Sequence, residues 1–591
     1  MKLRTPLAAA ILALSLTITA CSSTRTTATE TATTSSATAT NASYDTTQPP
    51  TIAQAMADNH DYTTYNDNEW DANDAQELSD TTATITSAGV YRLSGDYTSV
   101  TITAADADVV LILDNATING DITVTEAANV AISTTGTNTV NGAIDSSADL
   151  TFSGNGSLTV TATDDGISSA DNLVILSGTI TVTAGDDGIQ ANDALAIEGG
   201  TITITASGDA LKSDKDDDPT KGYIYITGGD ITITTDGDAL AATTDILITD
   251  GKISITAGGS AATGKNEEIS QKGLKAGSYI ISEGGTIAIN TADDALHSDG
   301  AIRLSSDSNV TLATGDDGVH TEVAVLIDGA SVTITESVEG IEAGLITIAD
   351  GDVDVTSSDD GINGSGSISA EAGVAAVAEN STTTYSTIAA TSKNDMPDQR
   401  MPGRGEMPGN MPGGGAMVGD ESTGEQVIIS GGTVTVNAGG DGLDSNGDLI
   451  ISGGTTTVWG PTDNGNGTID YAGTFEITGG ELIAVGSNGM PANPTSTDGQ
   501  GWISASASGN AGNEIVISNS AGNEIARFSA LKNFGLVQYS SSQLTNGETY
   551  TVSVNGTDTT ITAGESTMGG PGGMGAPDQM GMPPMGSAPA Q

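Results

Sequence analysis

Much of the chain between residues 82 and 490 alternates branched apolar residues with threonine or other polar residues. Examples are Thr-Ile-Thr at 84–86, Val-Thr-Ile-Thr at 100–103 and Thr-Ile-Thr-Ile-Thr at 201–205. Alternation with a period of two predicts β-strands that bury one face. No helical period is sustained, so the pattern predicts an all-β fold.

A short acidic turn recurs through the same region, usually about 22 residues after the previous copy. The ten copies are Asp-Asp-Gly-Ile (164–167, 186–189 and 359–362), Gly-Asp-Ala-Leu (208–211 and 237–240), Lys-Gly-Leu-Lys (272–275), Asp-Asp-Ala-Leu (293–296), Asp-Asp-Gly-Val (316–319), Glu-Gly-Ile-Glu (339–342) and Asp-Gly-Leu-Asp (441–444). A fixed period of this length is typical of a solenoid, in which each repeated side chain forms a column along the stack.

One central repeat predicts the geometry of a coil. Strands at 195–197 and 201–205 flank Gly199-Gly200, and the glycine pair recurs at 228–229, 284–285, 431–432, 453–454 and 479–480. Glycine permits the positive φ or the close approach that a sharp corner requires. We therefore expect a parallel β-helix of roughly 13 to 16 coils between residues 82 and 490. The residues expected to point inward are Ile189, Leu195, Ile197, Ile202 and Ile204.

Composition divides the chain into segments. The β-helix is expected over 82–365 and 427–495, interrupted by a low-complexity Met/Pro/Gly insertion at 366–426. Residues 496–563 alternate like strands and are interpreted as a small C-terminal β cap, because an uncovered last coil would expose a sheet edge. Residues 46–81 form an N-terminal polar segment or cap, and 21–45 and 564–591 are expected to be a disordered tether and tail.

The N-terminus resembles the signal peptide of a bacterial lipoprotein over residues 1–20. Lys2 and Arg4 precede an apolar run, and Ile18-Thr19-Ala20-Cys21 resembles a lipobox. This predicts cleavage before Cys21, lipidation there, and an exported protein anchored in the bacterial cell envelope. The alternative is an ordinary secretory signal with a chance cysteine. Cys21 is the single cysteine, so an intrachain disulfide is excluded.

The charge balance limits the partners. Against 17 Lys and Arg the chain has 76 Asp and Glu, a formal net charge of −59. Nucleic acid is an unsuitable partner, and membrane contact is expected only through the lipid on Cys21. Such a surface fits cation binding, and we expect a monomer.

The acidic turns are candidate calcium sites. Coils lie about 4.8 Å apart, where two unit charges repel by about 1 kcal/mol in water and about 3.5 kcal/mol at an effective dielectric constant of 20. Protonation, exposure to solvent or bound cations would relieve this repulsion, and carboxylates and turn carbonyls suit Ca²⁺. A solvated turn is the alternative, since Asp-Gly is common turn chemistry. The candidate ligands are Asp164, Asp165, Asp186, Asp187, Asp209, Asp214, Asp238, Asp293, Asp294, Asp299, Asp316, Asp317, Asp359, Asp360 and Asp441. The sequence shows no Cys or His cluster that would suit zinc.

A variable column follows the turns. Three residues after the turn Asp come Ser168, Gln190, Lys212, Ala241, Lys275, His297, His320, Glu342, Asn363 and Asp444. A position that varies while its neighbours repeat is where a binding surface would be encoded. We expect Gln190, His297, His320 and also Trp459 to face a ligand. Lys212 or Lys275 would be the proton-abstracting base of a lyase, with exposed polar side chains as the alternative.

The repeated Asp-Gly-[Ile/Leu]-X-[Ser/Ala]-[Asp/Asn] turn resembles the carbohydrate-binding β-helix family first described from a cellulolytic clostridium. So do Lys221-Gly-Tyr-Ile-Tyr-Ile-Thr-Gly-Gly and the segment from Val458 to Phe475. The resemblance spans about 70–560. It implies a right-handed parallel β-helix, Ca²⁺ sites, and binding of cellulose-like or acidic plant polysaccharides. The implied Ca²⁺ ligands are Asp165, Asp187, Asp209, Asp294, Asp317, Asp360 and Asp441, and Lys272 stands where a turn Asp is expected.

Three functions follow as hypotheses. The leading one is a surface-anchored, non-catalytic protein that binds cellulose-like polysaccharide or polyuronate with the help of Ca²⁺. A Ca²⁺-dependent polysaccharide lyase would need more cationic help than isolated lysines provide, because Arg303 is the only Arg between Arg92 and Arg400. The third is a structural adhesin or spacer. Flat cellulose usually requires aromatic platforms, and the chain has three Trp.

Overall fold

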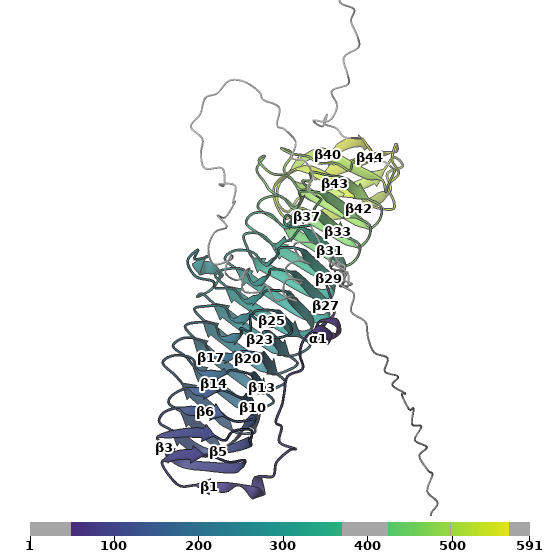
Figure 1. Cartoon of the computed structure of the whole chain (residues 1–591). Coiled ribbons are helices and arrows are strands. Elements are labelled where there is room, and N and C mark those ends of the chain that lie inside the picture. The colour runs from purple at the N-terminus through teal and green to yellow at the C-terminus, as the bar shows by residue number, and fades with distance from the viewer. Residues whose placement is uncertain (1–48, 369–423, 497, 566–591) are drawn as a thin grey trace, which may run out of the picture. The chain divides into compact units, whose positions relative to one another are not determined.

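The computed structural model describes residues 49–368, 424–496 and 498–565, which form a parallel β-solenoid (Figure 1). The predicted all-β class is confirmed. The helices among these residues are α1 (Ile52–Asp58) and the 3₁₀ turns η1 (Ala72–Asp74) and η2 (Ala261–Thr263). No helix of the described residues is both long and apolar enough to span a membrane. The signal peptide with Cys21, the tether, most of the Met/Pro/Gly insertion and nearly all of the tail lie outside the described residues.

Each central coil contains three strands, where the sequence predicted two. The additional strand is the three-residue segment directly after the acidic turn, which is too short to show an alternating pattern. These short strands stack into a 14-stranded parallel sheet, here called the turn sheet. Its strands are β2 (Thr82–Ile85), β4 (Ser99–Thr103), β6 (Ile122–Glu126), β9 (Ile144–Ser146), β12 (Ile167–Ser169), β15 (Ile189–Ala191), β18 (Leu211–Ser213), β21 (Leu240–Ala242), β24 (Leu274–Ala276), β26 (Leu296–Ser298), β28 (Val319–Thr321), β30 (Ile341–Glu342), β32 (Ile362–Gly364) and β35 (Leu443–Ser445).

The other two strands of each coil belong to a second, 27-stranded sheet. Long strands such as β25 run through both rows of this sheet and join them. Its strands up to the last coil are β1 (Gln76–Leu78), β3 (Gly89–Tyr97), β5 (Asp108–Ile118), β7 (Asn129–Thr135), β8 (Thr137–Val140), β10 (Asp149–Gly154), β11 (Ser157–Thr161), β13 (Asn172–Ile175), β14 (Thr179–Thr183), β16 (Ala194–Ile197), β17 (Thr201–Ala206), β19 (Tyr223–Ile226), β20 (Asp230–Thr235), β22 (Asp245–Ile248), β23 (Lys252–Ala257), β25 (Tyr279–Thr291), β27 (Ala301–Thr314), β29 (Ala324–Glu336), β31 (Leu345–Thr356), β33 (Gln426–Ile429), β34 (Thr433–Asn437), β36 (Asp448–Ile451), β37 (Thr455–Trp459), β38 (Phe475–Ile477) and β39 (Glu481–Gly486).

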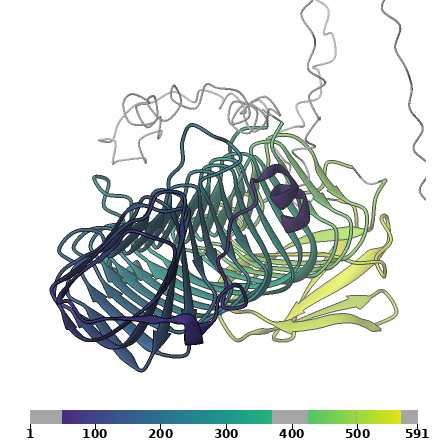
Figure 2. The same ribbon diagram turned by 60° about the horizontal axis from the view of Figure 1, so that its bottom comes forward.

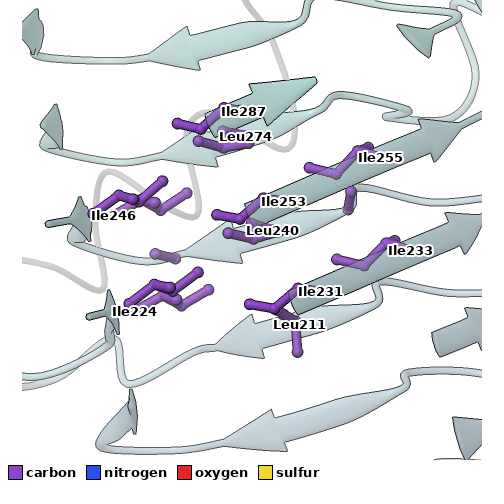
Figure 3. Close-up of a cluster of buried hydrophobic side chains, with 14 of the residues drawn as sticks. Leu211, Ile224, Ile231, Ile233, Leu240, Ile246, Ile253, Ile255, Leu274 and Ile287 are labelled. Carbon is purple, nitrogen blue, oxygen red and sulfur yellow. The ribbon is translucent and has the colours of Figure 1, made fainter. Parts of the chain in front are cut away.

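The core is a set of aliphatic columns inside the coils (Figure 3). Ile189, Leu195, Ile197, Ile202 and Ile204 are all buried, as predicted. Each stacks on its equivalent in the next coil, and Ile202, for example, pairs in register with Ile231. Because the same residue type repeats at most levels, the columns are mainly aliphatic, and Phe152 and Phe475 are exceptions.

The glycine pair forms the corner between the two longer strands. The second glycine has a positive φ, +97° at Gly200 and +100° at Gly229. A Cβ on the first glycine, Gly199, would lie 2.9 Å from the carbonyl oxygen of Leu176 in the coil below. The corner therefore requires glycine for both of the predicted reasons.

The stack is continuous across residues 369–423, which the structure does not describe. Ile362 pairs directly with Leu443 in the turn sheet, and Leu345 pairs with Gln426 in the larger sheet. The long interval between the last two acidic turns therefore leaves no gap in the column of turns.

The N-terminal segment lies along the outside of the coils, where α1 is seen in Figure 2. The apolar face of α1 packs on Leu247 and Ile281. From there the segment passes successively earlier coils until Trp70 packs against Val90 and Val110, and β1 then pairs with β3. The contacts in between include His60 N–H to Thr220 O (2.7 Å), Tyr62 Oη to Glu198 Oε1 (3.0 Å) and Tyr65 N–H to Thr151 Oγ1 (3.1 Å).

The C-terminal unit covers the last coil with antiparallel strands. β43 (Phe534–Ser540) pairs with β39 of the last coil and with β40 (Trp502–Gly509). A separate four-stranded antiparallel sheet consists of β41 (Glu514–Asn519), β42 (Glu524–Ser529), β44 (Thr549–Val554) and β45 (Thr557–Thr562). The change from parallel to antiparallel pairing ends the solenoid, as expected for a cap.

Candidate functional site: the column of acidic turns

The acidic turns lie one above another and are linked by a ladder of hydrogen bonds. At seven turns the backbone N–H of the turn residue donates to Oδ1 of the turn Asp in the preceding coil, whereas the N–H of Asp294 donates to Oδ1 of Asp293. The donors and acceptors are Asp187 and Asp165 (3.1 Å), Asp209 and Asp187 (2.7 Å), Asp238 and Asp209 (3.0 Å), Lys272 and Asp238 (2.8 Å), Asp317 and Asp294 (3.2 Å), Glu339 and Asp317 (3.4 Å), and Asp441 and Asp360 (2.6 Å). The turn Asp is therefore a structural group as well as a candidate ligand, which the sequence did not reveal.

The turn glycine permits this close stacking. A Cβ on Gly188 would lie 2.5 Å from the carbonyl oxygen of Ala210 in the next coil. The small residue at this position, glycine in most turns and alanine at Ala210, Ala239 and Ala295, thus lies at the contact beside a carboxylate that bridges the coils.

The ladder uses only Oδ1 of each Asp, so Oδ2 remains for other partners. At the turns of Asp187, Asp209 and Asp238 these partners are lysines. Lys212 Nζ lies 2.8 Å from Asp187 Oδ2 and 3.4 Å from Asp209 Oδ2, and Lys275 Nζ lies 3.1 Å from Asp238 Oδ2. The charges at these turns are neutralised by ammonium groups.

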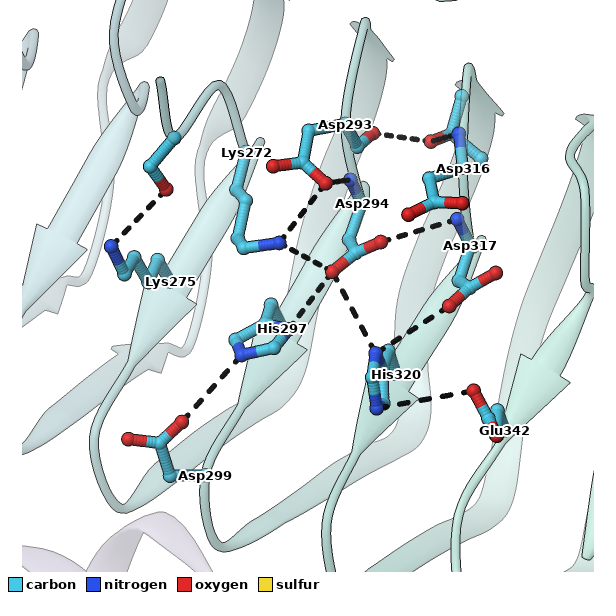
Figure 4. A network of polar contacts seen from close by, with 12 residues as sticks. Lys272, Lys275, Asp293, Asp294, His297, Asp299, Asp316, Asp317, His320 and Glu342 are labelled. Atoms are coloured by element: carbon cyan, nitrogen blue, oxygen red, sulfur yellow. Dashed lines mark hydrogen bonds and ion pairs between the residues drawn. The ribbon is translucent and has the colours of Figure 1, made fainter. Parts of the chain in front are cut away.

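Lysines also occupy the centre of the column. Lys272, which replaces a turn Asp, is buried between Asp293 Oδ1 (3.1 Å) and Asp294 Oδ2 (2.5 Å) (Figure 4). Lys265 Nζ lies 2.7 Å from Asp316 Oδ2. Lys272, which stands at the position of a turn Asp, therefore neutralises the carboxylates of the next turn. In the sequence, the Lys-Gly-Leu-Lys copy of the motif marked this position.

The variable column has the predicted register. Gln190 pairs with Lys212, Lys275 with His297, and His297 with His320 in the turn sheet. Gln190 Nε2 donates to Asp214 Oδ2 at 2.7 Å, so Asp214 contacts a side chain of this column. The side chains of the column lie beside the turn carboxylates.

Two of the three histidines meet in this column (Figure 4). The rings of His297 and His320 are 5.1 Å apart and nearly perpendicular, and both face the buried Asp294. The sequence showed no His cluster for zinc, whereas in the structure these two histidines, 23 positions apart, become neighbours because the coils stack.

The charges around Asp294 shift neighbouring pKa values in opposite directions. Burial raises the pKa of Asp294, but contacts with His297, His320 and Lys272 outweigh it and hold the pKa well below 3.8. Burial, and then the charge of Asp294, raise the pKa of Asp317 well above its ordinary value. Burial lowers the pKa of His320, but the carboxylates around it raise it to about 9.

The carboxylates of the last turns are not neutralised by a described Lys or His side chain. Carboxylate oxygens of Asp360, Asp441 and Asp444 lie within 4.8 Å of one another, and no described Lys, Arg or His forms an ion pair with them. Burial, and then mutual repulsion, raise the pKa of Asp444 to about 7. Burial likewise raises the pKa of Asp360 to about 7 and of Asp441 to about 6.

An unpartnered oxygen lies next to this cluster. Asn363 is the cross-strand neighbour of Asp444, is 8% exposed, and donates from Nδ2 to Glu339 Oε2 (2.8 Å). Its Oδ1 is buried without a hydrogen-bond partner. Asp360, Asp441 and Asp444, with Asn363 on the neighbouring strand, are here called the acidic end cluster, in which three carboxylates lie together and an amide group lies beside Asp444. Asp444 and Asn363 were not among the predicted metal ligands, although both lie in the variable column.

The remaining candidate residues have separate surroundings. Asp164, Asp165 and Asp186 form a second group of carboxylates without an ion-paired base among the described residues, and Asp359 is exposed. Asp299 Oδ1 lies 3.5 Å from His297 Nε2. Trp459 packs with the apolar core of the C-terminal unit, and Trp502 is 5% exposed.

Comparison with known proteins places the chain in a family. A family model described as "Carbohydrate-binding domain-containing protein" matches residues 79–318 and 306–459. These spans cover more than half of the 591 residues and include every acidic turn. The chain belongs to this carbohydrate-binding family.

Two other comparisons add no support for the family assignment. One solved structure, "polysaccharide lyase-like protein from C. thermocellum, Gadolinium derivative", is 28% identical, covers 32% of this chain and 91% of its own, and has a TM-score of 0.30. A TM-score this low does not establish a shared fold. No curated protein matches the chain.

Proposed function

We propose that this member of the carbohydrate-binding family is a non-catalytic envelope protein that binds a polyuronate through Ca²⁺ held at the acidic turns. Attachment through a lipid on Cys21 is part of the proposal and rests on the lipobox resemblance in the sequence. The family match supports a carbohydrate partner, and the rest follows from the charges of the column.

The acidic end cluster carries the calcium part of this proposal. Ca²⁺ takes six to eight oxygen ligands at about 2.3–2.6 Å, and carboxylates and amide oxygens are its usual protein ligands. Asp360, Asp441, Asp444 and Asn363 Oδ1 supply such donors. Their raised pKa values mean that ionisation there is unfavourable without a cation. Coordination positions left over would be open to water or to a sugar carboxylate.

Calcium is proposed only where no base already compensates the carboxylates. The group of Asp164, Asp165 and Asp186 meets this condition as well. At Asp187, Asp209 and Asp238 an ammonium group occupies the side of Oδ2, so a second cation would be repelled there.

Polyuronate is favoured over cellulose by the position of the tryptophans. Trp502 is buried, and Trp70 and Trp459 are half-buried against apolar clusters, which leaves little tryptophan surface for stacking on a flat sugar chain. A protein with a net charge of −59 repels a polyanion, so Ca²⁺ bridging supplies the attraction that the side chains lack.

The lysines are poorly suited to the lyase hypothesis. Burial lowers the pKa of Lys212, but its contacts with Asp187 and Asp209 raise it well above its ordinary value, so the amine is held protonated and cannot abstract a proton. The Lys275 ammonium is paired with Asp238. Arg303, the only Arg in this part of the sequence, pairs with Asp328 (2.6 Å) in the larger sheet.

Co-sedimentation tests this function. The mature chain from Cys21, with Cys21→Ser, is mixed with insoluble pectate or with cellulose, in Ca²⁺ or in chelator, and the supernatant is assayed for unsaturated uronide. We expect retention on pectate in Ca²⁺, release by chelator and no product. Product would establish a lyase, and the absence of retention on either polymer would favour a spacer.

A further inference from the structure

The histidine pair has a different chemistry from the other turns. His297 Nδ1 lies 2.9 Å from Asp294 Oδ2, and His320 Nδ1 lies 3.7 Å from Asp294 Oδ2 and 3.4 Å from Asp317 Oδ2. One ligand atom from each of Asp294, His297 and His320 lies within 4.8 Å of the others. Imidazole nitrogen favours Zn²⁺, Cu²⁺ or Ni²⁺, whereas Ca²⁺ prefers oxygen.

We infer that Asp294, His297 and His320, beside which Asp317 lies, form a binding site for a divalent transition-metal ion such as Zn²⁺. This site is separate from the proposed calcium sites and does not depend on the proposed function.

The distances suit tetrahedral coordination. Metal–nitrogen and metal–oxygen distances of about 2.0–2.2 Å place neighbouring ligand atoms of a tetrahedron about 3.3–3.5 Å apart. The three separations between Asp294, Asp317 and the histidine Nδ1 atoms are 2.9, 3.4 and 3.7 Å. With three protein ligands, a water molecule would take the fourth position of the tetrahedron.

The other nitrogen of each histidine also faces a carboxylate. His297 Nε2 lies 3.5 Å from Asp299 Oδ1, and His320 Nε2 lies 3.9 Å from Glu342 Oε2 (Figure 4). Metal-binding histidines usually donate their second N–H to a carboxylate or carbonyl, which fixes the ring and leaves the first nitrogen free to ligate. Asp299 and Glu342 would be positioning residues of this kind.

Lys272 opposes metal binding but does not block it. Its ammonium lies 2.5 Å from Asp294 Oδ2 and 3.1 Å from Asp293 Oδ1. If the metal takes Asp294 Oδ2, Lys272 keeps Asp293 as its partner. The nearby positive charge weakens the affinity for a dication, and the two histidines make the site selective for metals that accept nitrogen.

Metal titration of the tag-free mature chain with Cys21→Ser tests the inference. Zn²⁺ binding is measured by calorimetry in saturating Ca²⁺, and Co²⁺ is added as a probe whose visible spectrum reports nitrogen ligation and coordination number. We expect one Zn²⁺ per chain in the micromolar range or tighter, and a tetrahedral Co²⁺ spectrum.

Variants locate the metal. His297→Ala and His320→Ala each weaken Zn²⁺ binding at least 100-fold, and Glu342→Gln weakens it about 10-fold as a positioning residue. His60→Ala is the matched control, because His60 is the third histidine and lies outside the column. Circular dichroism checks that each variant keeps its β structure. Absence of Zn²⁺ binding, binding unchanged in both column variants, or equal loss in His60→Ala would overturn the inference.

Discussion

Replacing Asp444 by Asn tests the role of a proposed cation ligand without removing a carboxylate of the hydrogen-bond ladder. Asp444 lies in the acidic end cluster but takes no part in the ladder of hydrogen bonds between turns. In the calcium-free protein its pKa is raised from 3.8 to about 7, so at pH 8 the ionised group disfavours the folded state by about 4 kcal/mol. Asp444→Asn removes this charge, and we expect the free energy of unfolding of the calcium-free protein to rise by about 1–4 kcal/mol.

The same substitution removes one of the proposed calcium ligands. We therefore expect Ca²⁺ to stabilise the wild type more strongly than the variant at pH 8. Urea unfolding followed by circular dichroism, in chelator and in Ca²⁺, measures both effects. At pH 5 the folded carboxyl is protonated while the unfolded one is still mostly ionised, so the difference in chelator should shrink to about 2 kcal/mol, and it should vanish only below about pH 3.

Asp145→Asn is the matched control, because Asp145 occupies the same column beside Ser168 but is exposed. It should change neither quantity by more than about 0.5 kcal/mol. If Asp444→Asn destabilises the calcium-free protein at pH 8, or leaves its stabilisation by Ca²⁺ unchanged, the electrostatic reasoning for this cluster is wrong.

Three further outcomes follow from the column and the corners. The pKa values of Asp360 and Asp441 are raised to about 7 and about 6, so the stability that their protonated forms contribute is present below about pH 4 and is lost as the pH rises through 6–7. Thermal melting in chelator should therefore show that the calcium-free protein is less stable at pH 8 than at pH 5. Lys272→Met leaves Asp293 and Asp294 buried without their ammonium partner and should cost about 3–5 kcal/mol in urea unfolding, whereas the exposed Lys252→Met should cost less than about 1 kcal/mol. Gly200→Ala places a Cβ at φ +97° and 2.9 Å from Gly178 O, so the melting temperature should fall by an amount equivalent to about 1–3 kcal/mol; an unchanged melting temperature would contradict the corner geometry.

The repeating parts of the fold were predictable because each has a local cause. Period-two alternation predicted the strands, the inward position of Leu195 and its equivalents, and the register of the variable column. The glycine pair predicted the corners, because only glycine adopts the φ required at Gly200. These features depend on residues within one repeat, and the period transfers them to the next.

Features that depend on contacts between coils were not predictable from one repeat. The pairing of Lys272 with Asp293 and Asp294 requires the distance between adjacent turns, and so does the contact of both histidines with Asp294, although the period had placed His297 and His320 in adjacent coils. The N-terminal segment has no period at all, so nothing local showed that Trp70 would pack on Val90 of an early coil. The turn Asp was recognised as acidic, but its role in the ladder depends on the N–H of the next coil.

The central claim, that calcium at uncompensated turns links this protein to a polyuronate, is tested most directly by calorimetry with oligogalacturonate. The wild type, the double variant Asp360→Asn/Asp444→Asn and the control Asp145→Asn are each titrated in Ca²⁺ and in chelator. The account predicts binding by the wild type and the control in Ca²⁺ alone, and at least tenfold weaker binding by the double variant. Equal binding by all three proteins, or binding by the wild type in chelator, would contradict it.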